Sequence, residues 1–189
     1  MTFPTARIER SEPMSASEQS RLAESLARQY GRLVFQAAYR VLGDAAQAED
    51  VQQEVFLRLL QSDGRDAIES WPAYLSAAAS RAAIDVLRRQ RRWWRALPLW
   101  RAQLPGAAES AEQANLHDER ARRLRQALAG LPRREAQCFG LRYLEGMEIE
   151  QIARSLQLSV NNVNVVLHRA RRRLEAELAE RGDTTEIAP

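Results

Sequence analysis

Apolar residues recur at steps of three and four through most of the chain, which is the spacing of one face of an α-helix. In the N-terminal half this pattern predicts three helices, which begin near Ser17, just after Asp44 and near Ser70. Gly43 ends the first helix, Asp44 is a suitable N-cap for the second, and Pro72 lies in the first turn of the third, where proline is tolerated. The N-terminal half therefore predicts one helical unit.

Periodicity is lost between residues 97 and about 111, where prolines, a glycine and small residues gather. Beyond this linker we expect further helices, one that ends at Gly130, then 134–144, 149–156 and 159–180. No segment alternates as a strand would. The predicted fold is all-α, with two small helical domains joined by a linker, and the second ends in a helix-turn-helix. We place the domains at 17–96 and 116–181, the linker at 97–115, and flexible tails at 1–16 and 182–189.

Residues 147–170 have the pattern of a helix-turn-helix. Ala153 is small where the two helices would cross, Leu158 packs at the turn, and Ser159 can cap the second helix. The turn normally has glycine where Gln157 stands. We therefore expect Gln157 in a left-handed conformation, at a cost of about 1–2 kcal/mol that packing offsets.

The outer face of the second helix carries amides and arginines, which suit base edges and phosphates. The alternative is a helical hairpin with a solvated basic face. The coincidence of small residue, turn, serine cap and inward valines favours DNA binding. The candidate DNA-binding residues are Ser159, Asn161, Asn162, Asn164, Val165, His168, Arg169, Arg171 and Arg172.

Charge is segregated along the chain although the net charge is only +3. All 28 basic residues are arginine, and each guanidinium can hold a phosphate or a guanine edge with two hydrogen bonds. Residues 44–69 contain seven acidic and two basic residues, whereas residues 81–101 contain seven arginines and one acid, Asp85. Alternating acidic and basic blocks predict more than one macromolecular partner.

Several classes of function are not indicated. The single cysteine, Cys138, and two separate histidines suggest neither a disulfide nor a metal site. Asp85, Glu54 and His117 form no acid–base or nucleophile constellation, so we expect no catalytic residues, no cofactor and no enzyme. No apolar run approaches the ~20 residues that span a bilayer, and no secretory signal is evident. We therefore expect a cytoplasmic protein without membrane insertion.

Two sets of motifs, one after the other along the chain, resemble those of a known protein family. The first set is YRVLGD at 39–44, AEDVQQEVFLRL at 48–59, Tyr74-Leu75, and IDVLRR at 84–89. The second set is LAGLPRRE at 128–135, LRYLEGM at 141–147, EQIA at 150–153, and LHRAR at 167–171. Together they resemble bacterial RNA polymerase sigma factors of the extracytoplasmic-function (ECF) group of the sigma-70 family, over residues 30–178.

The resemblance implies roles for both domains. In the family, region 2 binds the β′ clamp helices of core RNA polymerase and melts the −10 promoter element, while region 4 binds the −35 element and the β flap. The implied core polymerase-binding residues are Asp50, Gln53, Glu54 and Phe56. The implied −10 residues are Arg81, Asp85, Arg88, Arg89, Arg91, Arg92 and Trp93. The helix-turn-helix residues would contact −35 DNA, and the loop at 61–70 would help capture a flipped base.

Alternatives stay open for individual residues. The acids of 44–60 could be a solvated face, and Trp93 and Trp94 could pack between domain and linker. The family usually has asparagine where Arg81 stands.

The expected function is that of an alternative sigma factor that directs core RNA polymerase to specific promoters, with promoter DNA and an anti-sigma factor as further partners. A stand-alone helix-turn-helix regulator that does not bind core polymerase is the alternative. The acidic block followed by the Arg/Trp block argues against it, because such a regulator needs no strand-melting surface.

Overall fold

The computed structural model describes residues 16–61, 68–96 and 116–179. Its N-terminal unit comprises α1 (Ala16–Leu42), α2 (Ala45–Gln61) and α3 (Trp71–Ala96). Its C-terminal unit comprises α4 (Leu116–Gly130), α5 (Arg133–Phe139), the π-helical turn η2 (Gly140–Leu144), α6 (Ile149–Leu156) and α7 (Val160–Ala179). These described segments contain helices and turns and no strand, so the all-α prediction is confirmed. The expected linker, both tails and most of the 61–70 loop lie outside them.

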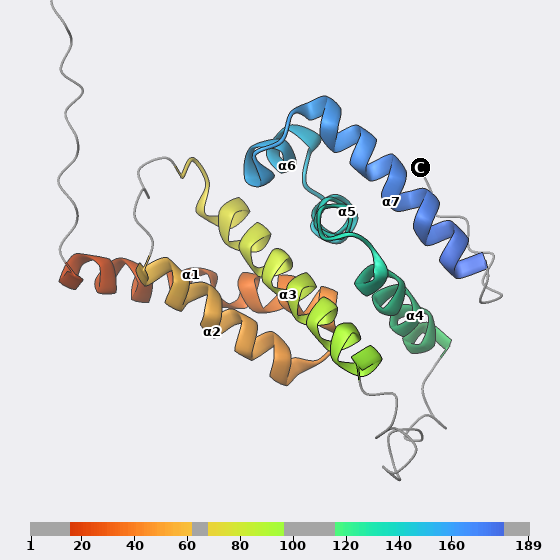
Figure 1. The fold of residues 1–189 in the computed structure, drawn as a ribbon. Helices are drawn as coiled ribbons and strands as arrows, with labels where there is room; N and C mark the ends of the chain where they lie inside the picture. The colour runs from red at the N-terminus through yellow and green to blue at the C-terminus, as the bar shows by residue number, and fades with distance from the viewer. Residues whose placement is uncertain (1–15, 62–67, 97–115, 180–189) are drawn as a thin grey trace, which may run out of the picture.

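The expected helix boundaries of the N-terminal unit are present. Gly43 has a φ of 68°, and its N–H donates to the Tyr39 carbonyl at 2.7 Å, which closes α1. The Asp44 carboxylate accepts from the Gln47 N–H at 2.9 Å and so caps α2, and Ser70 caps α3 through the Ala73 N–H. The apolar stripes of the three helices face one another, and α1 packs along both α2 and α3 (Figure 1).

Helix α3 belongs to the cores of both units. It crosses the middle of the molecule, with α1 and α2 on one side and α4 and α5 on the other (Figure 1). Leu75 and Ile84 share a buried cluster with Leu128 of α4, while Ala77 joins the helix-turn-helix cluster around Cys138. The two helical units are therefore packed against each other in this structure and are not separate bodies.

The helix expected at 134–144 is interrupted by a wider turn. After Phe139 the chain forms η2, in which the Glu145 N–H donates to the Gly140 carbonyl five residues earlier, at 3.1 Å. Gly140 lies against α3 so closely that a Cβ there would be 2.8 Å from Cδ1 of Ile84. The close approach requires glycine, and the π-turn carries Glu145 toward α1 and α3.

Among the described helices, none combines the length and the apolar character needed to cross a membrane.

The Gly140 contact can be tested by substitution. Gly140 has ordinary helical dihedrals, so alanine would stabilise the helix by about 0.5–1 kcal/mol if space allowed. Because its Cβ would meet Ile84, we expect Gly140→Ala to lower the free energy of unfolding by about 1–3 kcal/mol instead. In an Ile84→Val background, which lacks the clashing methyl, the loss should shrink. Urea unfolding of all four proteins measures this, and an equal loss in both backgrounds would contradict the contact.

Candidate nucleic-acid interface

The turn between α6 and α7 has the geometry expected of a helix-turn-helix. Gln157 adopts φ 54° and ψ 48°, the left-handed conformation predicted from the sequence. The Leu158 N–H donates to the Ala153 carbonyl at 2.9 Å, and the Ser159 hydroxyl accepts from the Asn162 N–H at 3.2 Å. The left-handed residue and the serine cap together set the direction in which α7 leaves the turn.

The inward and outward faces of α7 are sharply different. Val163 and Leu167 are buried against Ile152 and Leu156 of α6. Most of the predicted DNA-binding residues are exposed on the opposite face, with Val165 at 40% exposure; they are Ser159, Asn161, Asn162, Asn164, Val165, His168, Arg169 and Arg172. Figure 1 shows this helix along one edge of the molecule. The amide and guanidinium groups are therefore free to enter a DNA groove.

Arg171 does not belong to this exposed set. It is partly buried, and its guanidinium lies over the Tyr143 ring, 5.1 Å from the ring centroid. The neighbouring Arg173 pairs with Glu135 of α5 at 3.3 Å. Both arginines tie α7 to the preceding helices. Arg171, which we predicted to contact DNA, is therefore already engaged within the C-terminal unit.

The arginine block of α3 is divided between solvent and the C-terminal unit. Arg89, Arg92 and Trp93 are exposed, and 64% of the surface of Trp93 is accessible to solvent. The linker against which Trp93 could pack lies outside the described residues, as does the side chain of Trp94. Exposed arginines beside an exposed indole ring suit phosphates and unstacked bases.

Two of the predicted −10 residues face the helix-turn-helix unit instead. Arg81, where the resemblance leads one to expect asparagine, donates to the Ser155 carbonyl near the end of α6 at 2.9 Å. Burial is the main cause that lowers the pKa of the Arg81 guanidinium. Asp85 accepts two hydrogen bonds from Arg133 of α5, at 2.6 and 2.9 Å, and the bonds to Asp85 raise the pKa of Arg133.

Arg88 and Arg91, one turn further along α3, are engaged in the same way. Arg88 donates to the Leu131 carbonyl, and burial lowers the pKa of its guanidinium. Arg91 donates to the Gln126 carbonyl at 2.9 Å and pairs with Glu177 of α7 at 3.1 Å. The resemblance implied that these arginines contact −10 DNA, but the sequence could not show that the C-terminal unit packs against them.

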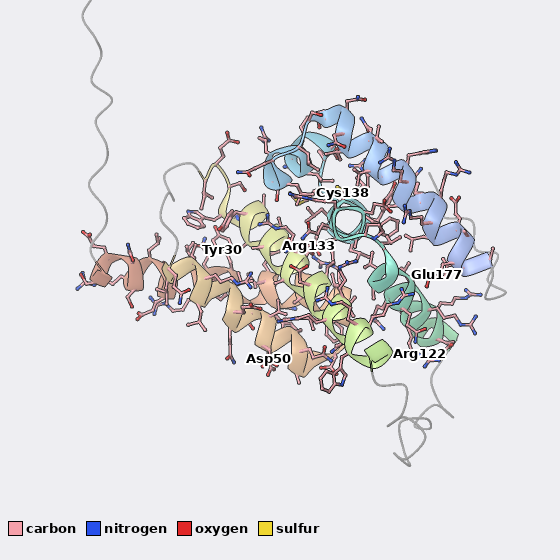
Figure 2. The ribbon with its side chains drawn as sticks, in the orientation of Figure 1. Tyr30, Asp50, Arg122, Arg133, Cys138 and Glu177 are labelled. Atoms are coloured by element: carbon pink, nitrogen blue, oxygen red, sulfur yellow. The ribbon has the colours of Figure 1, made fainter. Side chains whose placement is uncertain are left out.

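The acidic helix α2 presents a different outer face from the expected one. Asp50 and Gln53 are exposed, as predicted, and Asp50 lies on α2, well away from α5 (Figure 2). Phe56, which we expected at the centre of this face, is partly buried against the core. The exposed apolar residue is its neighbour Leu57, at 57% exposure. Leu57 lies four residues after Gln53, so both are on the same face of the helix, and this spacing in the sequence could have identified Leu57.

Glu54 lies at the edge of the α2 face. It is partly buried, and its carboxylate accepts from Arg58 one turn later, at 2.5 Å. Glu54 and Arg58 line a hollow of about 330 Å³, and Asp85, Arg89 and Arg133 are among the other residues that line it. Five of the eight residues that line it are arginines, so cations gather where α2, α3 and α5 meet.

Cys138 is fully buried beside α3 in the helix-turn-helix core (Figure 2). Burial raises the pKa of its thiol to about 11, so it is a poor nucleophile at neutral pH. Within the described residues no group of three or more histidine, cysteine or acidic side chains is placed to hold a metal ion.

Comparison with known families identifies both halves. The family model described as Sigma-70 region 2 matches residues 26–93, and that described as Sigma-70, region 4 matches residues 121–174. The two matches occur in the family's order and together cover more than half of the chain. The chain belongs to the sigma-70 family, in its ECF group. The N-terminal unit is region 2, and the C-terminal unit is region 4.

Individual relatives agree with this assignment. The chain is 30% identical over 164 residues to the ECF RNA polymerase sigma factor SigE of Mycolicibacterium smegmatis, covering 86% of this chain and 63% of the relative. It is 28% identical over 131 residues to the ferric citrate uptake sigma factor FecI of Escherichia coli, covering 69% and 76%. This chain thus spans less than two thirds of SigE. A solved structure, CnrH in complex with the cytosolic domain of CnrY, shares the fold, with a TM-score of 0.52, 22% identity, and coverage of 87% and 92%.

The strained residue of the turn gives a test of the helix-turn-helix geometry. Glycine adopts the left-handed conformation without the steric cost that Gln157 bears. We expect Gln157→Gly to raise the free energy of unfolding by about 0.5–1 kcal/mol. Gln157→Ala keeps the steric cost and serves as the control, with no gain expected. Equal stability of the two variants in urea unfolding would show that the turn is not left-handed in solution.

Proposed function

We propose that this chain is an alternative sigma factor, which binds core RNA polymerase and directs it to specific promoters by recognising −35 DNA and melting −10 DNA. The observation that carries the proposal is the ordered pair of region 2 and region 4 matches, in a chain whose α2 and α7 both present exposed, chemically distinct faces. The relatives named above are sigma factors in their own descriptions, which supports the same reading.

The polymerase-binding surface is assigned to α2. Asp50, Gln53 and Glu54 supply acceptors, and Leu57 adds an apolar group that is free to be buried by a partner. An exposed apolar residue surrounded by polar groups is the usual anatomy of an interface centre. The β′ clamp helices are the expected partner, and the β flap is the expected partner of region 4.

Promoter contacts are assigned to α7 and α3. Asn161, Asn162 and Asn164 can read base edges in the major groove, while Arg169 and Arg172 neutralise phosphates. Arg89, Arg92 and Trp93 form the accessible part of the −10 surface; arginine would hold the backbone, and the indole could stack on an unpaired base.

This assignment gives the chain itself no catalytic step and no cofactor, since the polymerase supplies the chemistry. Its place of action would be the cytoplasm, and an anti-sigma factor would be its regulator, as the resemblance implies. A stand-alone helix-turn-helix regulator remains the alternative. The region 2 match disfavours it, because that half would then have no task.

Binding to purified core polymerase tests the proposal and the α2 surface together. The full chain should co-elute with core polymerase and support specific transcripts from a genomic fragment library. Leu57→Asp should weaken the complex by about tenfold or more, because it buries a charge at the interface centre. Gln36→Asp places the same charge at an exposed position of α1 and should bind normally. Absence of binding by the unaltered chain would favour the stand-alone regulator.

Two substitutions in α7 should separate affinity from sequence reading. Arg172→Ala in the holoenzyme should weaken binding to all promoters alike and reduce the slope of log affinity against log salt by about one. Asn162→Ala should instead change the preference among −35 sequences, by about 1–3 kcal/mol at the base pair it reads. Arg120→Ala, an exposed arginine of α4, is the charge-matched control. The reverse pattern would mean that the helix faces are wrongly assigned.

A further inference from the structure

The hollow where α2, α3 and α5 meet concentrates positive charge in a small volume of about 330 Å³. Its lining contains five arginines from the three helices, which are Arg58, Arg88, Arg89, Arg92 and Arg133. The lining also contains two carboxylates, Glu54 and Asp85, and the buried Ala82. Five guanidinium groups against two carboxylates leave three positive charges that no other group of the lining compensates.

Each of the two carboxylates holds one of the arginines. Glu54 accepts from Nη2 of Arg58 at 2.5 Å, and Asp85 accepts from Nε and Nη2 of Arg133 at 2.9 and 2.6 Å. Figure 2 places Arg133 between α3 and α5. A guanidinium has five N–H donors, so both arginines keep donors that these pairs do not use. Glu54 and Asp85 therefore fix the direction of two cations of the hollow.

The charges of the other three arginines are not neutralised. Arg88 donates to the carbonyl of Leu131, which is an uncharged group. Arg89 and Arg92 are exposed, and neither forms a hydrogen bond or an ion pair with another described residue. Burial, and after it repulsion from Arg92, lowers the pKa of the Arg88 guanidinium. Like charges are therefore held close together, and an anion between them would relieve their repulsion.

We propose that this hollow binds a compact oligophosphate, a chain of two or three linked phosphate groups, either as a free anion or as the phosphate tail of a nucleotide. The proposal goes beyond the sigma-factor function, because it assigns a small ligand to the chain itself. Arginine holds phosphate oxygens with paired, charge-assisted hydrogen bonds. Since the arginines come from three helices, they can reach such a ligand from several sides.

Charge and volume together indicate a short chain of phosphates. One phosphate group carries a charge of about −1.5 to −2 at neutral pH, which is less than the three uncompensated charges of the hollow. Two or three linked phosphates carry enough charge to neutralise them. Ligand clefts have volumes of about 300–1,000 Å³, so this hollow suits a small ligand and leaves any attached nucleoside outside.

The exposed arginines of α7 provide a contrast within the same chain. Arg169 and Arg172 lie on the outer face of one helix and do not line the hollow. A concave site with cations on several sides focuses the electric field more strongly than a convex helix face does. An oligophosphate should therefore prefer the hollow, and Arg172→Ala is the charge-matched control for substitutions there.

Isothermal titration calorimetry on the full-length chain tests the site. A salt concentration of about 0.15 M screens general attraction between anions and exposed arginines. The probes are inorganic phosphate, pyrophosphate, tripolyphosphate, ADP and ATP, all without magnesium. We expect one pyrophosphate or tripolyphosphate to bind per chain with a dissociation constant below about 1 mM, and phosphate to bind at least about tenfold more weakly.

Four variants show whether the ligand occupies the hollow. Arg89→Ala and Arg92→Ala each remove an exposed cation, so both should fold, and each should weaken pyrophosphate binding by about tenfold. Arg92→Lys keeps the charge but loses the paired donors, so its loss of affinity should be smaller. Arg172→Ala should bind pyrophosphate as the unaltered chain does.

The nucleotide probes distinguish the two sources of the ligand. If ADP and ATP bind more tightly than pyrophosphate and tripolyphosphate, the site takes the phosphate tail of a nucleotide. Equal or weaker binding of the nucleotides means that the site takes a free oligophosphate, and both results support the proposal.

Three results would overturn the proposal. They are no binding of pyrophosphate or tripolyphosphate below about 1 mM, binding of phosphate as tight as theirs, and a loss of affinity in Arg172→Ala equal to that in Arg92→Ala. The titrations contain neither polymerase nor promoter DNA. A failed oligophosphate site therefore leaves the sigma-factor proposal untouched, and absence of binding to core polymerase would overturn that proposal alone.

Discussion

Helix α3 packs against both helical units at once, and the rest of the structure depends on this double packing. Residues 76–83 of α3 are all alanine or serine except Arg81, and these small side chains allow α1 on one side and η2 on the other to approach closely. Gly140 completes this arrangement, because Ile84 fills the space that any side chain there would need. The π-turn follows directly after this contact, and Glu145 then accepts hydrogen bonds from Arg40 of α1 and from Ser76 and Ser80 of α3.

All basic residues of the chain are arginine, which suits the contacts that α3 makes with the C-terminal unit. A guanidinium has several donors in a rigid plane and remains charged when partly buried. Arg81, Arg88 and Arg91 therefore satisfy backbone carbonyls of region 4 here, and the same donors suit phosphates. Lysine, as a single strongly hydrated point charge, would fit the buried carbonyl contacts less well.

The sequence predicted those structural features that depend on residues close together in the chain. The helices, the caps at Asp44 and Ser159, and the left-handed Gln157 depend on residues within a few positions of one another, and all are present. The hydrogen bonds that Glu145 accepts from Arg40, Ser76 and Ser80 join residues 65 to 105 positions apart, and no periodicity carries that information. Leu57 was missed for another reason: Phe56 is larger, but the helical step places it toward the core.

The packing of α3 divides its polar groups between solvent and the C-terminal unit. Arg89 and Arg92 are exposed, whereas Arg81, Asp85, Arg88 and Arg91 make hydrogen bonds to the C-terminal unit. Attraction to phosphate does not depend on sequence, so a guanidinium that is already engaged with a carbonyl contributes less to it than one in solvent. The contacts that hold α3 against its neighbours therefore decide which of its arginines are accessible in this structure.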